Sequence, residues 1–276
     1  MKTGFFRYKG KKDRNWEVWE IKKKQRIWLL TGMVLVGAFL WAGSVFAAEK
    51  VSVDRYLRSK RYDTYYVYND SSQSIPLYMG RSTASQIYGY LGYGDAVKLQ
   101  KSLLKRGKKY RFLPVYMPRE KGTLYVVAGQ VKVKGIRLKQ MSTNPLRHKV
   151  VRYGIKFLGT PFSLGSSSLT GGIDCANFVK ACYQYAGIYL GYPHTDNLRF
   201  QGMTVPIRNL RAGDLLFYLE NDTYGPIGHV AMYLGDGFII HASGHYGETY
   251  PFGGICVKRV NYGNRRPVLC KRIIQG

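Results

Sequence analysis

The sequence predicts an α+β protein in which a small all-β domain precedes a second domain that mixes helices and strands. From residue 62 to about 139, short runs rich in Tyr, Val and Ile alternate with turn residues, a pattern typical of a small barrel. From residue 148 on, two segments with helical spacing surround a glycine-rich loop, and a β-hairpin follows. At 276 residues, 45% of them hydrophobic, the chain is long enough for two packed domains.

The N-terminal segment has the features of a targeting signal. Residues 1–26 carry ten basic and three acidic residues, and the uncharged apolar stretch Ile27 to Ala48 follows at once. The small side chains at its end indicate a signal peptide cleaved after Ala47. A stretch of 22 residues would also span a bilayer as a retained anchor. Under either interpretation, residues 49–276 lie outside the cytoplasmic membrane. We therefore expect a secreted, cell-wall-associated or periplasmic protein, in contact with the membrane only through residues 27–48 if these are not cleaved.

The chain is strongly basic, with 43 Lys and Arg against 16 Asp and Glu and a formal charge of +27. Residues 49–276 alone keep 33 basic and 13 acidic residues. Such a charge excess attracts polyanions. For an exported protein we expect no nucleic acid partner, but anionic wall polymers, peptidoglycan carboxylates and anionic lipid headgroups are available. A solvated basic surface without a specific partner is the alternative. One dense basic run comprises Lys101, Lys105, Arg106, Lys108, Lys109 and Arg111.

The cysteine pattern argues against disulfide and metal sites. Four cysteines are too few for a disulfide framework in a chain of this length. Their spacing lacks the CxxC pattern and the chain has only five His, which speaks against a zinc site. We expect no cofactor and no metal. The four are Cys175, Cys182, Cys256 and Cys270.

The N-terminal β region resembles a bacterial SH3-like domain. Predicted strands lie at 65–68, 87–90, 96–99, 111–115 and 124–127. Residues 76–87 (PLYMGRSTASQI) and 91–97 (LGYGDAV) follow the residue order of that family over roughly 75 residues. The family's Trp before the penultimate strand is absent, and residues 110–112 occupy its place. The resemblance implies an SH3-like barrel that targets the protein or restricts its substrate; a spacer without a ligand is the alternative. With its leader and linker, this domain spans residues 49–145.

The second domain, residues 146–276, opens with a predicted helix at 148–158 and contains a cysteine at a second helix start. In residues 173–187, apolar side chains recur at helical spacing, Asp174 is a good N-cap and Gly187 a good stop signal. Cys175 then lies in the first turn, where the helix dipole and free N–H groups favour a thiolate. A small core residue is the alternative, but Cys182 suits that role better.

A candidate base and its orienting partner lie about 55 residues further on. Residues 227–242 predict a hairpin around a Gly-Asp-Gly turn, with His229 and His241 six residues on either side of Gly235. A tight turn there would bring the two His opposite each other, give or take one residue, and on a shared face. A cysteine nucleophile needs such a base, and the base needs a group that orients it.

Five motifs in order resemble the NlpC/P60 family of cell-wall peptidases, which has a compact papain-like fold. They are residues 159–166 (GTPFSLGS), 174–179 (DCANFV), 187–202 (with Gly187-Ile188, Pro193-His194-Thr195 and Gln201-Gly202), 210–218 (LRAGDLLFY) and 229–243. The resemblance covers residues 148–276. It implies that Cys175 is the nucleophile, His229 the base and His241 the third polar residue. The backbone N–H of Cys175 is the expected oxyanion donor. It further implies hydrolysis of peptidoglycan stem peptides, typically between γ-D-glutamyl and a diamino acid.

The chain departs from the family pattern around the nucleophile. Phe162 replaces a Tyr that lines the site, Ala176 replaces a Ser and Asn177 replaces a Gly. With Asp174, which in some relatives meets the amino end of the stem peptide, these are the expected substrate-binding residues; simple N-capping is the alternative for Asp174. Two other functions stay open: an N-acetylmuramoyl-L-alanine amidase or other amide hydrolase, and a catalytically impaired wall-binding protein.

Overall fold

The computed structural model describes residues 50–59, 62, 64–118, 122–137, 144–221 and 225–276. The predicted signal peptide or anchor (1–48) and the linker residues 141–143 lie outside these ranges. In the part of the chain that is described, no helix is both long and apolar enough to cross a membrane. The described residues belong to one compact unit.

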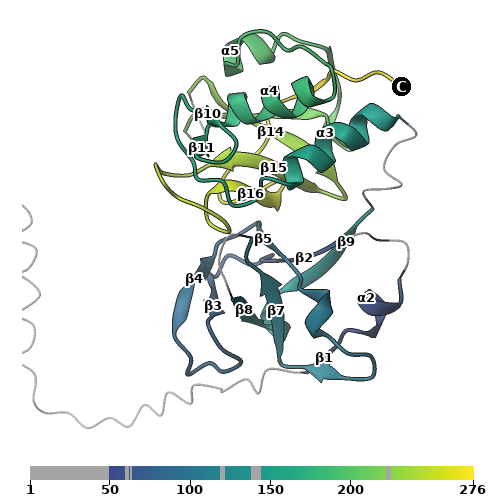
Figure 1. Cartoon of the computed structure of the whole chain (residues 1–276), viewed down its shortest axis with the longest axis vertical. Helices are drawn as coiled ribbons and strands as arrows, with labels where there is room; N and C mark the ends of the chain where they lie inside the picture. The colour runs from purple at the N-terminus through teal and green to yellow at the C-terminus, as the bar shows by residue number, and fades with distance from the viewer. Residues whose placement is uncertain (1–49, 60–61, 63, 119–121, 138–143, 222–224) are drawn as a thin grey trace, which may run out of the picture. The chain divides into compact units, whose positions relative to one another are not determined.

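The C-terminal half places helices against one face of an antiparallel sheet (Figure 1). Helices α3 and α4 pack on the central strands, and strand β14 pairs with β13 on one side and with β15 on the other. The helices are α3 (Pro145–Ile155), α4 (Cys175–Tyr185) and α5 (Thr195–Leu198). The strands are β10 (Ser167–Ser168), β11 (Gly172–Ile173), β12 (Met203–Thr204), β13 (Leu215–Leu219), β14 (Ile227–Gly235), β15 (Phe238–Ser243), β16 (Gly254–Arg259) and β17 (Leu269–Arg272).

The N-terminal half is built of short strands, as predicted. One sheet has the order β4-β3-β8-β7, and β1 pairs with β6. The elements are β1 (Val51–Ser52), α2 (Asp54–Arg58), β2 (Thr64–Tyr68), β3 (Ile75–Tyr78), β4 (Ile87–Leu91), β5 (Asp95–Lys98), β6 (Lys109–Tyr110), β7 (Phe112–Tyr116), β8 (Thr123–Val127) and β9 (Lys132–Ile136). The five predicted strands correspond to β2, β4, β5, β7 and β8 within two residues.

The sheets of the two halves are continuous. The long sheet has the order β12-β17-β13-β14-β15-β16-β5-β2-β9, so three N-terminal strands extend the C-terminal sheet. The junction is the antiparallel pairing of β5 with β16, with Ala96 opposite Val257 and Asp95 opposite Lys258. Two sequence domains therefore share backbone hydrogen bonds, a feature that the linker-like composition of residues 141–145 did not predict.

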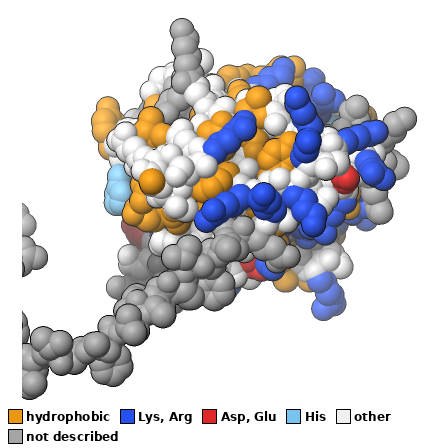
Figure 2. Space-filling view, turned by 90° about the horizontal axis from the view of Figure 1, so that it is seen from below, with side chains coloured by type: hydrophobic (Ala, Val, Ile, Leu, Met, Phe, Trp, Pro, Cys, Tyr) orange, Lys and Arg blue, Asp and Glu red, His pale blue; other side chains and the backbone are white. Residues whose placement is uncertain are grey.

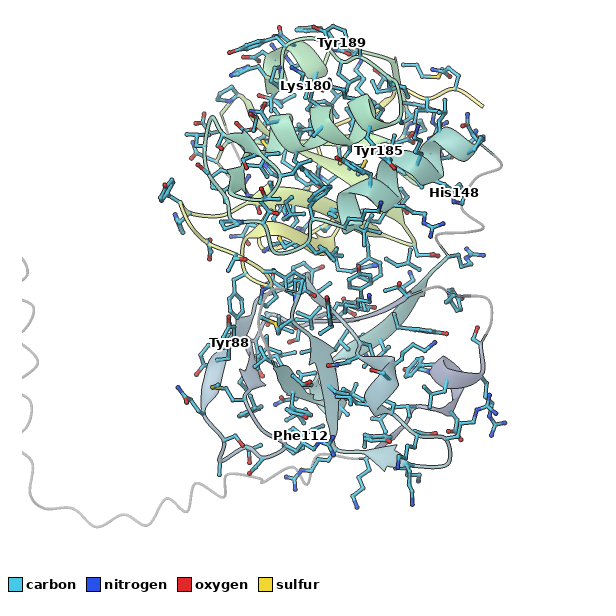
Figure 3. All side chains as sticks on the ribbon, in the orientation of Figure 1. Tyr88, Phe112, His148, Lys180, Tyr185 and Tyr189 are labelled. Atoms are coloured by element: carbon cyan, nitrogen blue, oxygen red, sulfur yellow. The ribbon has the colours of Figure 1, made fainter. Side chains whose placement is uncertain are left out.

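Helix α3 begins earlier than the periodicity predicted because residues 144–145 form a good helix start. The side chain of Asn144 accepts a hydrogen bond from the N–H of Leu146, and Pro145 occupies the first turn. On the buried face, Gly154 lets α4 approach closely, since a Cβ there would lie 3.0 Å from the Phe178 ring. Tyr153 of α3 stacks on Tyr185 of α4, with ring centroids 3.8 Å apart. Figure 3 labels Tyr185 at the two helices.

A buried ionic network holds α3 to the end of the chain. Asp214, with no exposed side-chain surface, accepts hydrogen bonds from Arg147 at 3.0 Å and from Arg272 at 2.7 Å. Arg147 also donates to the carbonyl oxygens of Ala212 and Ile274. Because the Asp214 carboxylate contacts both guanidinium groups and these also have carbonyl acceptors, the penalty of burying the network is reduced. Asp214 belongs to the GDL motif seen in the sequence, and its role here is structural.

The replacement Asp214→Asn should strongly destabilise the protein, because it leaves two buried guanidinium groups without a counter-charge. We expect the free energy of unfolding to fall by about 3–5 kcal/mol, measured by urea denaturation. The control is Arg58→Gln, which breaks a pair with Asp54 in which the Arg58 side chain is 70% exposed; it should cost less than about 1 kcal/mol. Equal costs for the two variants would contradict this role of Asp214.

Candidate active site

Cys175 is the first residue of α4, as predicted, and Asp174 caps the helix. One carboxylate oxygen of Asp174 accepts a hydrogen bond from the N–H of Asn177 at 2.8 Å. The other accepts from the side-chain amide of Asn177 and from the N–H of Gly165, both at 3.0 Å. Asp174 is 8% exposed. The N-cap prediction is confirmed, and the same carboxylate ties the glycine-rich loop to the helix start.

The Cys175 thiol does not have the lowered pKa that its helix position predicted. Burial raises its pKa to about 11, and the nearby Asp174 carboxylate adds to this. The backbone N–H groups of Val230, Ala176 and Cys175 itself act in the opposite direction. The effect of burial on the thiol pKa is larger than that of the helix dipole. A half-buried sulfur has little water to stabilise the charge of a thiolate, whereas the dipole of one helix terminus contributes only about 1 kcal/mol. The Cys175 thiol is therefore neutral at neutral pH, and a nucleophilic role would need a base that removes its proton during reaction.

His229 and His241 share a hydrogen bond. The Nε2 atom of His229 lies 2.8 Å from Nδ1 of His241, and the ring centroids are 5.0 Å apart. His229 is 8% exposed and His241 is fully buried. The two imidazoles lie on one face of the hairpin, as predicted. The predicted register, which set His229 and His241 opposite each other within one residue, was wrong. The pairing of Met232 with Ile240, continued along the strands, sets Ser243 opposite His229, so the two His are diagonal neighbours.

Both imidazoles are neutral at neutral pH. Burial, reinforced by the positive charges of Arg265 and Lys258, lowers the pKa of His229 from 6.5 to about 3. Burial and His229 hold the pKa of His241 well below its ordinary value. A neutral imidazole that donates from Nε2 keeps Nδ1 as an acceptor. If His229 donates from Nε2 to His241, its Nδ1 is available as the base.

Ser243 extends this chain by one residue, and sequence reasoning missed it. Its Oγ lies 3.3 Å from Nε2 of His241. When His229 donates from Nε2 to Nδ1 of His241, the His241 ring carries its own proton on Nε2 and donates it to this oxygen. The signal that could have found Ser243 is strand alternation, since residue 243 follows residue 241 by two on the same face of β15. Tyr218 and Tyr262 pack beside the imidazoles, with centroid distances of 5.9 Å to His229 and 5.2 Å to His241.

The Cys175 thiol lies near the strand that carries His229 but, in the part of the chain described, makes no hydrogen bond to the imidazole. The thiol lies against the backbone N–H of Val230, the residue that follows His229. Among the described residues, the thiol makes no hydrogen bond to the His229 ring. Proton transfer needs the two groups within about 3 Å, directly or through one water, and such contacts often tighten only when substrate binds.

The remaining predicted site residues surround the start of α4. Asn177 is half-buried and bonded to Asp174, whereas Ala176 is 5% exposed and packs into the core. Phe162 forms a bridge with Ile173 and exchanges backbone hydrogen bonds with the segment 247–248. The structure therefore brings Phe162, Asp174 and Asn177 to the start of α4, where Cys175 lies, and gives the Ala176 side chain little surface for a ligand.

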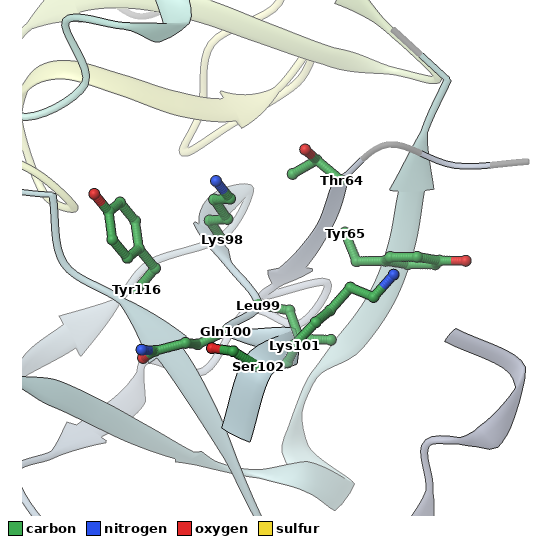
Figure 4. Close-up of a pocket in the computed structure, with 8 residues that line it drawn as sticks. All are labelled: Thr64, Tyr65, Lys98, Leu99, Gln100, Lys101, Ser102 and Tyr116. Carbon is green, nitrogen blue, oxygen red and sulfur yellow. The ribbon is translucent and has the colours of Figure 1, made fainter. Parts of the chain in front are cut away.

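Two cavities lie away from this site. One, of about 350 Å³, is lined by Lys98, Lys101, Tyr65 and Tyr116 among others (Figure 4). The other, of about 450 Å³, shares Lys98 and Tyr116 and adds Lys156 and Thr160. Among the described residues that line either cavity, none is acidic. On the face seen in Figure 2, Lys and Arg side chains are abundant and acidic ones few.

All four cysteines are free. Within the described ranges, no group of three or more His, Cys, Asp or Glu side chains is placed to hold a metal ion. The groups that the structure brings together here are a thiol, two imidazoles and backbone N–H donors.

Comparison with known proteins identifies the C-terminal domain. Residues 159–259 match the model of the NlpC/P60 family. A gamma-D-glutamyl-L-lysine dipeptidyl-peptidase of Bacillus cereus is 34% identical over 98 residues, 36% of this chain and 29% of the relative. A probable endopeptidase of Mycobacterium tuberculosis is 34% identical over 98 residues, 35% of this chain and 23% of the relative. An NlpC/P60 family protein of Bacillus cereus with a solved structure is 20% identical, with a TM-score of 0.41, over 77% of this chain and 64% of that one. The chain spans less than a third of the length of these two curated relatives.

The buried imidazoles predict a loss of stability in mild acid. Because the folded state favours neutral His229, the unfolded state binds more protons below pH 6.5. This stabilising contribution is complete above pH 6.5 and is lost as the pH falls towards about 3. Between pH 7 and pH 4, the free energy of unfolding of the wild type should fall by about 3 kcal/mol more than that of His229→Gln. Urea denaturation at both pH values measures this, and identical pH dependence in the two proteins would count against a buried neutral His229.

Proposed function

With residues 159–259 identified as an NlpC/P60 family domain, we propose that the chain is an exported cysteine endopeptidase that cuts peptidoglycan stem peptides. The bond we propose is that between γ-D-glutamyl and the diamino acid. The observation that carries the proposal is the hydrogen-bonded pair His229–His241 beside a thiol at a helix start. The relatives include a gamma-D-glutamyl-L-lysine dipeptidyl-peptidase, a probable endopeptidase and a peptidoglycan endopeptidase, and their activities suggest the substrate class.

In the proposed mechanism the neutral thiol is activated only during reaction. Nδ1 of His229 takes the proton of Cys175 as the sulfur attacks the peptide carbonyl. The backbone N–H of Cys175 stabilises the oxyanion. His229 then returns the proton to the leaving amine, and water hydrolyses the thioester in a second step. His241, held by Ser243, keeps the His229 ring in the tautomer that this sequence of steps needs.

The location we propose follows from the substrate and the N-terminus. Peptidoglycan lies outside the cytoplasmic membrane, and the basic and apolar residues 1–48 are a signal peptide or anchor that would export the chain. We assign the N-terminal β region to the SH3-like class on its motifs. The basic run noted in the sequence lies in the connection between β5 and β7, with only Lys109 in a strand, β6.

The cavity lined by Lys98 and Lys101 and the second cavity, which shares Lys98, fit an anionic wall polymer. The Lys98 ammonium lies 5.1 Å from the Tyr116 ring centroid, and that of Lys101 lies 5.0 Å from the centroid of Tyr65. Aromatic rings hold these cations without neutralising them. A chain of phosphodiesters could then lie along the cavities and meet both ammonium groups.

The variant Cys175→Ala should release no stem-peptide fragments from purified peptidoglycan, because the nucleophile is missing. The measurement is mass analysis of the soluble products. The control is Cys182→Ala on the same helix: Cys182 is fully buried, so its loss lowers stability but leaves fragment release intact. Wild-type fragments that end in γ-D-glutamate and expose the diamino acid amine support the proposal.

Two outcomes of the fragment analysis would contradict the proposed function. Free muramoyl ends with intact stem peptides would indicate an amidase instead of an endopeptidase. Fragment release by Cys175→Ala at the wild-type rate would rule out Cys175 as the nucleophile.

Binding to polyglycerol phosphate should weaken in the double variant Lys98→Gln/Lys101→Gln. We expect a loss of about 1 kcal/mol for each ammonium group removed, measured by calorimetric titration at low salt. The matched control is Lys149→Gln/Lys180→Gln, which removes the same charge from α3 and α4 and should weaken binding far less. Equal losses in the two double variants would mean that only net charge matters.

A further inference from the structure

The pairing of β5 with β16 brings a carboxylate of the N-terminal region to the catalytic domain. Asp95 lies opposite Lys258, and its Oδ1 is 2.6 Å from the Lys258 Nζ. Each side chain is only 12% exposed. The other oxygen, Oδ2, accepts a hydrogen bond from the N–H of Gly92 at 2.8 Å. Asp95 is therefore oriented from both sides, by its own turn and by the lysine.

Lys258 lies on the side of the sheet that carries the catalytic imidazoles. His241 pairs with Cys256, and Lys258 follows Cys256 by two residues, so it shares the face of His241. Its ammonium is 5.3 Å from the centroid of the Tyr262 ring, which in turn is 5.2 Å from the His241 ring. The positive charge of Lys258 contributes to the lowered pKa of both imidazoles.

A buried ammonium so placed opposes catalysis. When His229 takes the thiol proton, an imidazolium forms, and an uncompensated cation nearby raises the energy of that state. Lys258 exerts this effect on His229 but contributes nothing to the pKa shift of Cys175. The titratable or charged groups around the imidazoles are Tyr218 on β13, Cys256 and Lys258 on β16, Tyr262 and Arg265 after β16, and Asp95 on β5, with Glu248 acting on Lys258.

We propose that Asp95 is a positioning residue for catalysis: it holds the Lys258 ammonium in a neutral pair, so that the His229 imidazolium can form beside it. The proposal rests on the proposed roles of Cys175 and His229. It gives the N-terminal β region a part in the electrostatics of the peptidase, beyond any role in wall binding. Burial lowers the pKa of Lys258, but Cys256 and Asp95 more than offset this and hold it above its ordinary value. The pair is therefore an ion pair at neutral pH.

Alkylation of Cys175 by iodoacetamide tests the proposal without any peptidoglycan. The thiol must lose its proton to displace iodide, and the other three cysteines are buried. In Asp95→Asn, alkylation at pH 7 should be about tenfold slower than in the wild type, the effect of one unit in the pKa of the base. The rate should recover as the pH rises, because the unpaired, buried Lys258 then loses its proton.

The role of the Asp95–Lys258 pair is tested by also removing the Lys258 ammonium. In Asp95→Asn/Lys258→Met no cation remains, so alkylation should return to within about twofold of the wild-type rate. Arg137→Gln is the matched control, because it breaks another ion pair between the same two regions, Arg137 with Asp236 at 3.4 Å. It should leave the alkylation rate and its pH dependence unchanged.

Two results would overturn the inference: an Asp95→Asn pH profile that coincides with the wild type, or a double variant as slow as Asp95→Asn. If Asp95→Asn does not fold, the variant Lys258→Met tests the inference in its place. Removing the cation must not slow alkylation of Cys175, and slower alkylation in Lys258→Met would overturn the inference. His229→Gln separates this inference from the proposed function. Normal alkylation in that variant would reject His229 as the base, whereas normal wild-type alkylation without fragment release would reject only the substrate.

Discussion

The antiparallel pairing of β14 with β15 is the constraint on which the site depends. Both imidazoles stand on these two strands, and the hydrogen bond between them exists only because the strand register makes them diagonal neighbours. The same strands form the floor on which α4 packs, so the backbone of Val230 meets the thiol at the helix start. A slip of one residue in this hairpin would move both His to the opposite face. The positions of Cys175, His229 and His241 relative to one another thus depend on this pair of strands and on the packing of α4 against it.

Burial then decides the charge states of the site. The thiol, His229 and His241 are all neutral because water is largely excluded from them. A neutral site costs less to bury than an ion pair and needs charge only at the moment of reaction. The helix dipole, which alone would favour a thiolate, is outweighed. The free N–H groups at the start of α4 still point to the place where an oxyanion would form.

Much of this arrangement was predictable from local sequence. The cap at Asp174, the helix that follows and the hairpin all rest on short-range rules of capping, spacing and turn chemistry. The register was wrong because Gly235 was taken as the turn centre, whereas Asp236 and Gly237, both with positive φ, form the loop. An Asp-Gly turn of this kind and a bulge at Leu234 shift the pairing. The raised thiol pKa and the junction of β5 with β16 could not be predicted, because burial and long-range strand pairing depend on the whole fold.

The continuous sheet also determines which parts of the chain can be separated. Strand β16 is an interior strand only because β5 covers it. Cutting the chain at residue 145 would expose the backbone N–H and C=O groups of β16 beside apolar residues such as Ile255 and Val257. A bare strand of this kind is a template for pairing with a second molecule. The peptidase half, isolated, would therefore tend to associate edge to edge, and the N-terminal strands act as its built-in protection against aggregation.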